Sequence, residues 1–453
     1  MKLKYKTILL SVLVVTLALM TFSYSQLPFY PPECPAGPSI NPGDRLLIVA
    51  PHPDDEVICN GGIIGYAVEH QVPVKVVVVT DGNDTKTSPV TRHNESINGT
   101  KILGLKEEDI IFLGYKDGSL RILLNDHWEI DNPFTASDGS KQINYPYALE
   151  KNGTYSGSSL TNNLKTIITD FKPTIIVYPS GDDEQFDHQA TSGFTELATT
   201  QTRYNGSKYT YLLHLPPNWP SPRSYYPEYY LIPPTKLVGM ENGPQWSMFN
   251  LTTHQQRLKE ESFQAYRTQI VPSSYLLSFL RKNELFAEYS TINVSPSNFN
   301  ENNYTRGLQV PPLLFVDTVG DGKYHGKEKP WDITSVGMDI NKDVVTGKSW
   351  ISLKTAGEPS SSAVYNVHLY IPNPEGIERV KISVESGVAS LEREGSDNST
   401  SEEIPLKIKN NTMIMGIPGN IFKNNPYLIL SAETIKSGGV LDQTPWRIIK
   451  VNT

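Results

Sequence analysis

The sequence predicts an α/β chain in two parts: a Rossmann-like, mostly parallel sheet with helices on both faces, followed by a C-terminal β-sandwich. Two observations predict it. Up to about residue 270, continuous apolar runs rich in β-branched residues alternate with helical stretches, which is typical of a parallel sheet buried on both faces. Beyond residue 308, strand-like runs are separated by clusters of Gly, Pro, Asn and Ser without helical periodicity, which is typical of a sandwich.

In chain order, apolar runs predict the strands of the first domain and 3.6-residue periodicity predicts its helices. The expected strands are 45–50, 74–80, 109–113, 174–178 and 209–215, and the expected helices are 60–70, 91–103, 160–170, 188–200 and 254–268. The clearest strands of the second domain are 313–316, 350–353, 364–371, 380–384 and 427–430. Because ligands bind beyond the carboxyl ends of parallel strands, we expect the chemistry just after residues 50, 80, 113 and 178.

Length and composition exclude some classes of function. The 453 residues fit two domains by size, over 44–308 and 309–453. A formal net charge of −8 argues against binding to a phosphate backbone, so nucleic acid is not an expected partner. The chain has two cysteines, Cys34 and Cys59, which excludes a cysteine-based zinc site. They predict either a disulfide that pins the leader to the first domain or a buried free Cys59.

The N-terminus predicts export. Three lysines precede an apolar run over 8–20 that is shorter than the roughly 20 residues needed to span a bilayer, so we expect a signal peptide over 1–25. An uncleaved anchor is the alternative. A Pro-rich leader follows over 26–43, and several Asn-x-Ser/Thr sequons agree with a secreted or cell-surface glycoprotein.

The first strand is followed by Pro-His-Pro-Asp-Asp-Glu over 51–56. An imidazole and two carboxylates at a buried strand end are costly without a compensating charge, and a metal ion is the obvious one. His52 and Asp55 can converge on one ion and leave Asp54 free to handle protons. The acidic run after the fourth strand ends in His188, the expected third ligand, because two His and one carboxylate are a common catalytic zinc set. An exposed turn is the alternative for the first motif alone.

These motifs resemble those of a known family. Strand then P-H-P-D-D-E, Gly61-Gly62, Thr80-Asp81-Gly82, Arg92-His93-Asn94-Glu95, Leu113 to Gly118 and the motif ending in Asp187-His188 follow one another in the order of the LmbE-like (PIG-L) zinc deacetylases, over roughly residues 44–269. That family removes acetyl groups from N-acetylglucosamine units. The resemblance implies one zinc per chain held by His52, Asp55 and His188, with Asp54 as general base on zinc-bound water.

The resemblance also implies roles around the metal. Arg92 is expected to contact the polar groups of the substrate, and Asp117 to contact a sugar hydroxyl. Glu95 is expected to brace the site structurally, and the alternative is that it only forms an ion pair with Arg92 on the same helix. Asp187 is expected to orient the ligand His188.

One position departs from the family pattern. The common motif reads H-P-D-H, whereas this chain has Gln185-Phe186-Asp187-His188. The amide of Gln185 can donate a hydrogen bond to the oxyanion but cannot give up or take up a proton as the histidine does. Glu184, Asp183 or His214 then fills the role of the missing histidine, or turnover is slower, or the substrate differs. The remaining histidines are expected at the surface or in the core.

The second domain opens with Asp317-Thr318-Val319-Gly320-Asp321. Val319 stands at the third position of an EF-hand template, so an EF-hand is not expected. Calcium at Asp317 and Asp321 is one interpretation and turn chemistry is the other. The segment resembles β-sandwich modules of secreted proteins, which implies contact with envelope glycans.

The sequence therefore predicts a secreted zinc hydrolase that deacetylates an N-acetylated amino sugar of a glycan or glycoconjugate. Two alternatives remain: a deacylase of another amide, and a non-catalytic glycan-binding surface protein that keeps the pocket.

Overall fold

A computed structural model describes residues 31, 33–83, 87–215, 217–271, 274–321, 329–373, 376–394, 401–423 and 426–452. The predicted signal peptide lies outside these residues, as do residues 26–30 and 32 of the leader. Within the described ranges, no helix is long and apolar enough to cross a membrane. Cys34 and Cys59 are free and Cys59 is buried, so the disulfide interpretation is wrong and the buried thiol is confirmed.

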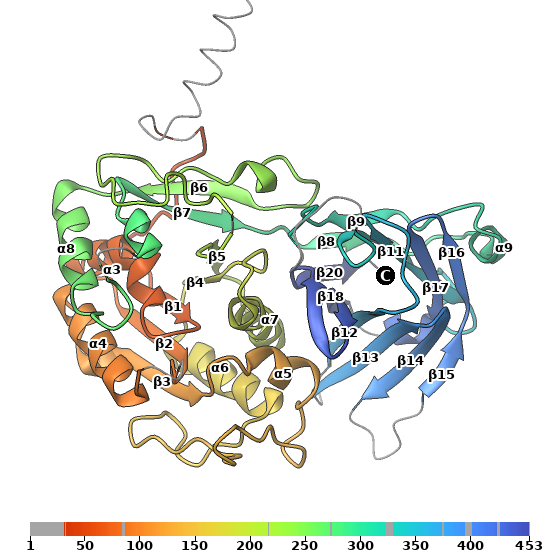
Figure 1. Cartoon of the computed structure of the whole chain (residues 1–453), viewed down its shortest axis with the longest axis horizontal. Coiled ribbons are helices and arrows are strands. Elements are labelled where there is room, and N and C mark those ends of the chain that lie inside the picture. Colours follow the sequence, from red (N-terminus) through yellow and green to blue (C-terminus); the bar gives the residue numbers. More distant parts are fainter. Residues whose placement is uncertain are drawn as a thin grey trace, which may run out of the picture.

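The first domain is built on a seven-stranded sheet of order β3-β2-β1-β4-β5-β7-β6 (Figure 1). Its strands are β1 (Leu46–Ala50), β2 (Val74–Thr80), β3 (Ile110–Tyr115), β4 (Ile175–Pro179), β5 (Ser207–Tyr211), β6 (Gln245–Asn250) and β7 (Asn283–Glu288). The first five run parallel, while β7 pairs antiparallel with β5 and β6. The predicted Rossmann-like sheet is confirmed. Strands β7 and β6, which were not predicted from the sequence, extend it at one edge.

Helices cover both faces of this sheet. They are α2 (Asp55–Ile58), α3 (Gly61–Glu69), α4 (Pro89–Ile102), α5 (Leu120–Asn125), α6 (Gly157–Phe171), α7 (Phe186–Gln201) and α8 (Thr253–Phe263), with 3-10 turns η1 (Glu107–Asp109), η2 (Thr235–Leu237) and η3 (Tyr275–Phe279). Alternate β1 residues enter opposite cores: Leu46 and Ile48 pack in the core of α3 and α8, and Leu47 and Val49 in the core of α5 to α7. The helix predicted over 254–268 ends at Phe263.

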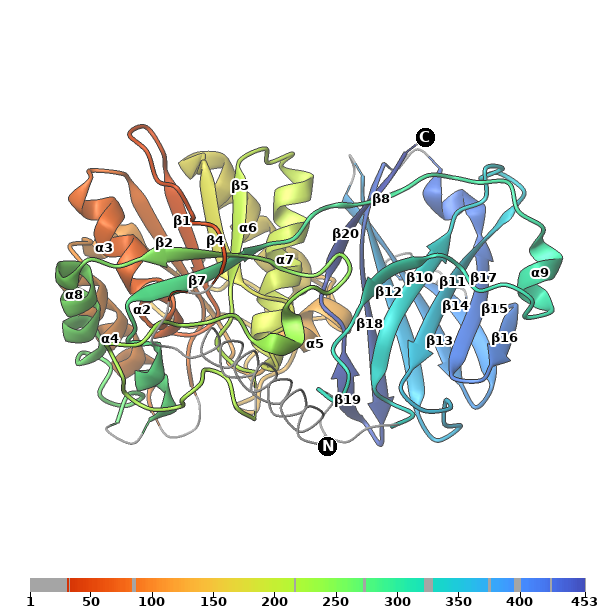
Figure 2. The same cartoon turned by 90° about the horizontal axis from the view of Figure 1, so that it is seen from above.

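The second domain is a sandwich of two sheets that share one core (Figure 2). The five-stranded sheet contains β9 (Leu313–Val316), β10 (Ile333–Asp339), β11 (Lys348–Thr355), β16 (Leu406–Lys409) and β17 (Thr412–Pro418). The other sheet contains β8 (Ile292–Val294), β12 (Val364–Asn373), β13 (Gly376–Glu385), β14 (Val388–Glu394), β15 (Ser401–Ile404), β18 (Tyr427–Lys436), β19 (Gly439–Gln443) and β20 (Arg447–Val451). Helix α9 (Glu301–Thr305) lies at one edge of the sandwich (Figure 2), and η4 (Gly419–Phe422) places Ile421 and Phe422 in the shared core. The predicted sandwich is confirmed.

Strand β8 pairs in parallel with β20, in register from Ile292 opposite Ile449 to Val294 opposite Val451. The chain therefore enters the eight-stranded sheet of the second domain before residue 308, where the boundary between the domains was predicted. A three-residue strand carries too short a pattern to be found from sequence, and its position depends on a partner strand at the far end of the chain.

The outer face of the eight-stranded sheet packs against the first domain. Trp446 and Tyr370 enter the core built around α5, α6 and α7, and a Cβ on Gly193 of α7 would approach Trp446 to 2.9 Å. The Tyr370 hydroxyl donates to the Leu124 carbonyl oxygen at 2.5 Å. The two domains thus share an apolar seam along α7, the helix that carries His188.

Glu433 is a buried charge in this seam. It is 2% exposed, and it pairs with Arg121 at 3.3 Å across the domains and with His368 at 3.1 Å. Burial alone would raise the pKa of Glu433, but His368, Arg121 and the Asn366 amide hold it down to about 2. Its charged form therefore stabilises the fold above the ordinary glutamate pKa, and this contribution is lost as the pH falls from about 4.5 towards 2.

We expect Glu433→Gln to lower the free energy of unfolding by about 3 kcal/mol at pH 7 and by progressively less as the pH approaches 2. Urea unfolding of both proteins between pH 2.5 and 7 measures this difference. Glu403→Gln, on the exposed strand β15, is the matched control and should change stability little at any pH. A deficit that stays constant with pH would contradict a role for the charge.

Candidate metal centre

The centre lies where the order of the sheet reverses. Strands β2 and β3 extend from one side of β1, and β4 and β5 extend from the other, so a crevice opens beyond the carboxyl ends of β1 and β4. His52 follows β1, Asp55 is the first residue of α2, and His188 lies in the first turn of α7 after β4. The structure brings these three predicted ligands together at the predicted strand ends.

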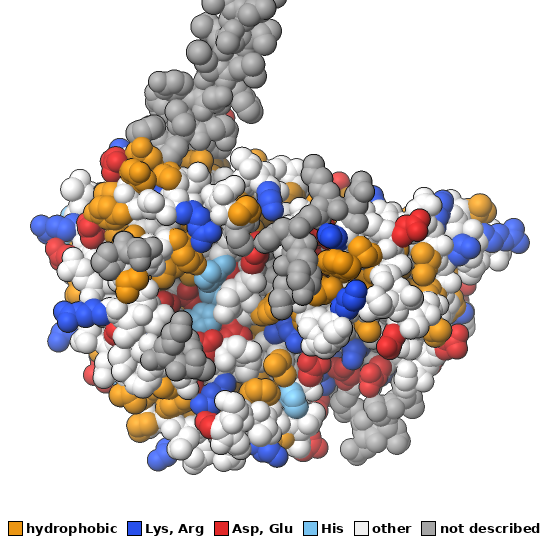
Figure 3. Space-filling view, in the orientation of Figure 1, with side chains coloured by type: hydrophobic (Ala, Val, Ile, Leu, Met, Phe, Trp, Pro, Cys, Tyr) orange, Lys and Arg blue, Asp and Glu red, His pale blue; other side chains and the backbone are white. Residues whose placement is uncertain are grey.

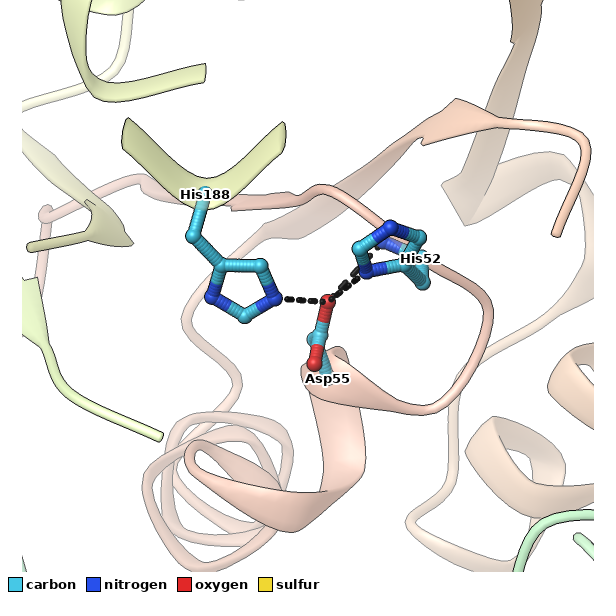
Figure 4. Close-up of side chains that lie close together, drawn as sticks. All are labelled: His52, Asp55 and His188. Carbon is cyan, nitrogen blue, oxygen red and sulfur yellow. Dashed lines mark hydrogen bonds and ion pairs between the residues drawn. The ribbon is translucent and has the colours of Figure 1, made fainter. Parts of the chain in front are cut away.

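Their ligand atoms converge on one point (Figure 4). His52 Nδ1 and His188 Nε2 each lie 3.2 Å from the same oxygen, Asp55 Oδ2. Ligands about 2.0–2.1 Å from a tetrahedral zinc lie about 3.3 Å from one another, so this spacing matches one ion shared by the three atoms. All three residues are buried.

The hydrogen bonding of His188 agrees with a ligand role. Within the described part of the chain, neither ring nitrogen has an aligned hydrogen-bond partner, although Nδ1 and Nε2 each lie 3.2 Å from a carboxylate oxygen. A fully buried imidazole with an unused donor or acceptor is costly. The buried, orphaned Nε2 and the two-histidine, one-carboxylate donor set therefore fit a zinc ion.

Asp183 stands behind His188, where we had expected Asp187. Its Oδ2 lies 3.2 Å from His188 Nδ1 and also accepts from the backbone N–H groups of Leu213 and His214 at 2.9 Å. Burial alone would raise the pKa of Asp183, but the imidazoles of His188 and His214 hold it far below the usual range. Asp183 is thus placed to hold the tautomer and orientation of His188.

Asp187 serves the opposite side of the site, so its expected contact with His188 is wrong. Its carboxylate accepts from the N–H groups of Gly118 at 2.6 Å and Leu120 at 3.0 Å, and lies 3.4 Å from His52 Nε2. In the first turn of a helix, a side chain one residue before His188 points away from that ring. Asp187 therefore ties the loop after β3 to His52.

Asp54 lies beside the three ligands with a strained backbone. Its φ of 154° falls outside the ordinary regions, and its N–H donates to Glu56 Oε2 at 2.8 Å. Burial raises the pKa of Asp54 to about 7, against the opposing charge of Arg92, whose Nη2 lies 3.4 Å from Asp54 Oδ2. A carboxyl group with a pKa near 7 suits proton transfer at neutral pH.

Arg92 is placed to support Asp54. It is 3% exposed and donates to the carbonyl oxygens of Pro53 at 2.8 Å and Gly82 at 3.1 Å, so the structure puts it beneath the loop rather than in the opening. Glycine at position 82 allows Pro53 to pack closely against this loop, because at its φ of 61° a Cβ would lie 2.8 Å from the Pro53 ring. The guanidinium of Arg92 thus lies beside Asp54, and its contact with the substrate stays a prediction.

Glu95 has the bracing role that we expected, through an unexpected partner. It accepts from the N–H of Thr268 at 2.9 Å and from the Thr268 hydroxyl at 2.6 Å, and it makes no ion pair with Arg92 within the described residues. Asp117 lies near the metal ligands, with Oδ1 3.5 Å from His52 Nε2. Burial would raise the pKa of Asp117, but this imidazole holds it below its usual value.

Gln185, at the departure from the family pattern, caps a helix. Its Oε1 accepts from the N–H groups of Asp187 at 2.6 Å and His188 at 3.2 Å, so it satisfies the start of α7. Its amide nitrogen lies 3.3 Å from His52 Nε2. Gln185 thus has a local structural role and no exchangeable proton to supply.

Among the three replacements considered for the missing histidine, His214 has the best position. Its ring lies 4.7 Å from the His188 ring, its Nδ1 lies 3.0 Å from Asp183 Oδ1, and its side chain is 28% exposed. Asp183 has a strongly lowered pKa and holds no proton to give. Glu184 lines a cavity between the domains. Figure 3 shows histidine side chains flanked by acidic ones at the floor of a hollow in the first domain.

Two contributors to the site were missed. Glu56 is buried, and its carboxylate accepts from the Asp54 N–H, from the Ser96 hydroxyl and, at 2.8 Å, from the Tyr266 hydroxyl. It thus anchors the backbone of Asp54 to buried side chains of the domain. Tyr275 lies near His214, with ring centroids 6.3 Å apart, and Arg223 stacks on it at 4.3 Å. Glu56 stands inside the sequence motif, whereas no local signal points to Tyr275.

Comparison with known proteins agrees with this geometry. Residues 47–199 match the PIG-L family, described as GlcNAc-PI de-N-acetylase. Residues 47–199 are a PIG-L family domain. The PIG-L domain spans β1 to α7 and so includes all three ligand residues and Asp54.

Two curated relatives match parts of the chain. An uncharacterized deacetylase, YaiS, of Escherichia coli is 32% identical over 88 residues, which cover 19% of this chain and 46% of the relative. A probable N-acetyl-α-D-glucosaminyl L-malate deacetylase of Bacillus anthracis is 30% identical over 150 residues, which cover 29% of this chain and 63% of the relative. The chain therefore spans less than two thirds of the length of either.

Solved structures are also similar to part of the chain. The N,N'-diacetylchitobiose deacetylase of Pyrococcus horikoshii is 19% identical, with a TM-score of 0.34 over 54% of this chain and 82% of the other. The zinc-inhibited form of a teicoplanin deacetylase is 17% identical, with a TM-score of 0.37 over 54% of this chain and 98% of the other.

Proposed function

We propose that the chain is a secreted, zinc-dependent N-deacetylase that removes the acetyl group from N-acetylglucosamine-type amino sugars of a glycan or glycoconjugate. The observation that carries the proposal is the convergence of His52, Asp55 and His188 on one point with the carboxyl group of Asp54 beside it. The deacetylase names of the two curated relatives support the reaction class.

When bound, zinc polarises a carbonyl oxygen and lowers the pKa of a coordinated water. Asp54 takes a proton from the attacking water, whose oxygen adds to the acetamide carbon. Asp54 then gives a proton to the amide nitrogen as the C–N bond breaks, which yields acetate and a free amine. Arg92 keeps Asp54 oriented, and Asp183 keeps His188 oriented.

In this proposal His214 stabilises the negative charge that develops on the carbonyl oxygen, in place of the family histidine. Its Nδ1–H donates to the Asp183 carboxylate, so the partly exposed ring donates to the oxyanion from Nε2–H in its doubly protonated form.

We expect His214→Gln to lower kcat by about 10²-fold or more with little change in KM, because a single oxyanion donor acts on the transition state. Steady-state kinetics and metal analysis on the same samples measure both effects. His254→Gln changes a half-exposed histidine on α8 and is the control. Wild-type kcat in His214→Gln would contradict the role.

A glycan-binding surface protein without turnover is the second candidate, and the amide at Gln185 is the observation that favours it. Envelope glycan contact through the C-terminal sandwich remains part of either proposal.

The deciding experiment measures acetate release from chitooligosaccharides and from N-acetylglucosaminyl lipids, with zinc content determined on the same protein. We expect release that depends on about one zinc per chain. Stoichiometric zinc without release from any acetylated sugar would favour the binding protein, and release from other amides alone would favour a different deacylase.

A further inference from the structure

A cavity of about 280 Å³ lies between the two domains, away from the metal centre. The loop before α7 and the first turn of α7 form one wall, through residues that include Glu184 and Gln189. Residues Asp317, Asp321 and Asp442 of the second domain line the other. The cavity therefore touches the segment that carries His188.

The three aspartates form a cluster of carboxyl groups that no cationic side chain of the described residues neutralises. Their ligand atoms lie within 4.8 Å of one another. Asp317 Oδ2 and Asp321 Oδ1 are buried without a hydrogen-bond partner, and none of the ion pairs in the described ranges involves these three side chains. Burial and mutual repulsion raise the pKa of Asp317 and Asp321 well above the usual value, and burial raises that of Asp442 to about 7.

Two buried amides face the same cavity. Gln443 is 5% exposed and Gln189 is 6% exposed, and both line the cavity. Over the described residues, Gln443 Oε1 and Nε2 and Gln189 Oε1 have no hydrogen-bond partner. Buried polar groups are nearly always paired, so these amides point independently to a missing polar ligand.

We propose that this cavity binds one Ca²⁺ through the carboxylates of Asp317, Asp321 and Asp442 and the amide oxygen of Gln443. Calcium takes six to eight oxygen ligands at about 2.3–2.6 Å in flexible geometry, and water fills the remaining positions. Magnesium requires near-ideal octahedral geometry at about 2.0–2.1 Å, which a wide cavity lined by long side chains does not impose.

The carboxylate of Asp442 is already oriented for this role. Its Oδ2 accepts from the N–H of Ile333 at 2.6 Å and its Oδ1 from the N–H of Gln443 at 3.0 Å, so strands β10 and β19 hold it in place. All four proposed ligands belong to the second domain, and the cavity that they line is closed on its other side by the loop before α7. This inference does not depend on the deacetylase proposal, because it concerns a separate set of residues.

The test uses the full chain, freed of calcium with a chelating resin and kept in buffer with zinc. Calorimetric titration with CaCl₂ should give one site per chain, and CaCl₂ should raise the melting temperature by several degrees over NaCl of equal ionic strength. MgCl₂ should give a smaller shift. The double variant Asp317→Asn/Asp321→Asn should lose the calcium response.

In calcium-free buffer, that double variant should melt at or above the wild-type temperature, because two buried carboxyl groups that are costly to ionise beside one another are replaced by neutral amides. Its loss of response then cannot come from misfolding. Glu402→Gln/Glu403→Gln removes two exposed carboxylates from β15 and should keep the full response. No calcium shift in the wild type, a shift retained in the double variant, or an equal shift with MgCl₂ would each overturn the proposal.

Discussion

Asp54→Asn should lower kcat by about 10²- to 10⁴-fold while the zinc content stays at the wild-type level. Asparagine has the shape of aspartate but cannot accept the proton of the attacking water. The three ligand residues keep their positions, since Asp54 Oδ2 is not among the converging atoms. Acetate release under saturating substrate, with metal analysis on the same preparation, measures both quantities.

Asp131→Asn is the matched control, because Asp131 is exposed and lies far from β1 in the sequence. It should retain wild-type activity. Near-normal turnover in Asp54→Asn would refute the base role, and a parallel loss of zinc would show that Asp54 holds the metal instead.

His188→Ala should abolish both zinc binding and activity. Alanine leaves two ligands for the ion and strips the carboxylates of Asp55 and Asp183 of the imidazole between them. We expect well under a tenth of the wild-type zinc per chain and no acetate release above background. Metal analysis after dialysis, together with far-UV circular dichroism, separates metal loss from unfolding.

His70→Ala serves as its control, because His70 is exposed and stacks on Tyr66 at the end of α3. It should bind zinc and turn over substrate normally. Stoichiometric zinc in His188→Ala would contradict the proposed centre, whatever its activity.

The first four strands of the α/β sheet could be predicted because each is a largely apolar run, whereas β5 has the mixed sequence Ser-Lys-Tyr-Thr-Tyr and only its end lies in the predicted run 209–215. Strands β6 and β7 were missed because their polar and apolar residues are mixed, as in the run from Gln245 to Asn250. Their place in the sheet depends on pairing with β5 and with each other. Local pattern carries no information about such pairing.

The metal ligands could be predicted because their chemistry is local: an imidazole and carboxylates directly after buried strands. The carboxylate that lies against the His188 ring could not be predicted. Asp187 stands next to it in sequence, yet helical geometry turns that side chain towards His52, and Asp183 reaches the ring from the preceding loop.

The sequence by itself determined the fold class, the three residues whose side chains converge and the motifs of the PIG-L family, because these depend on residue type and short spacing. Tertiary structure decided which carboxylate supports each ligand, that Gln185 caps α7, and that Asp442 joins Asp317 and Asp321. Those contacts join residues distant in the chain, and only the packing of the sheet and of the two domains brings them together.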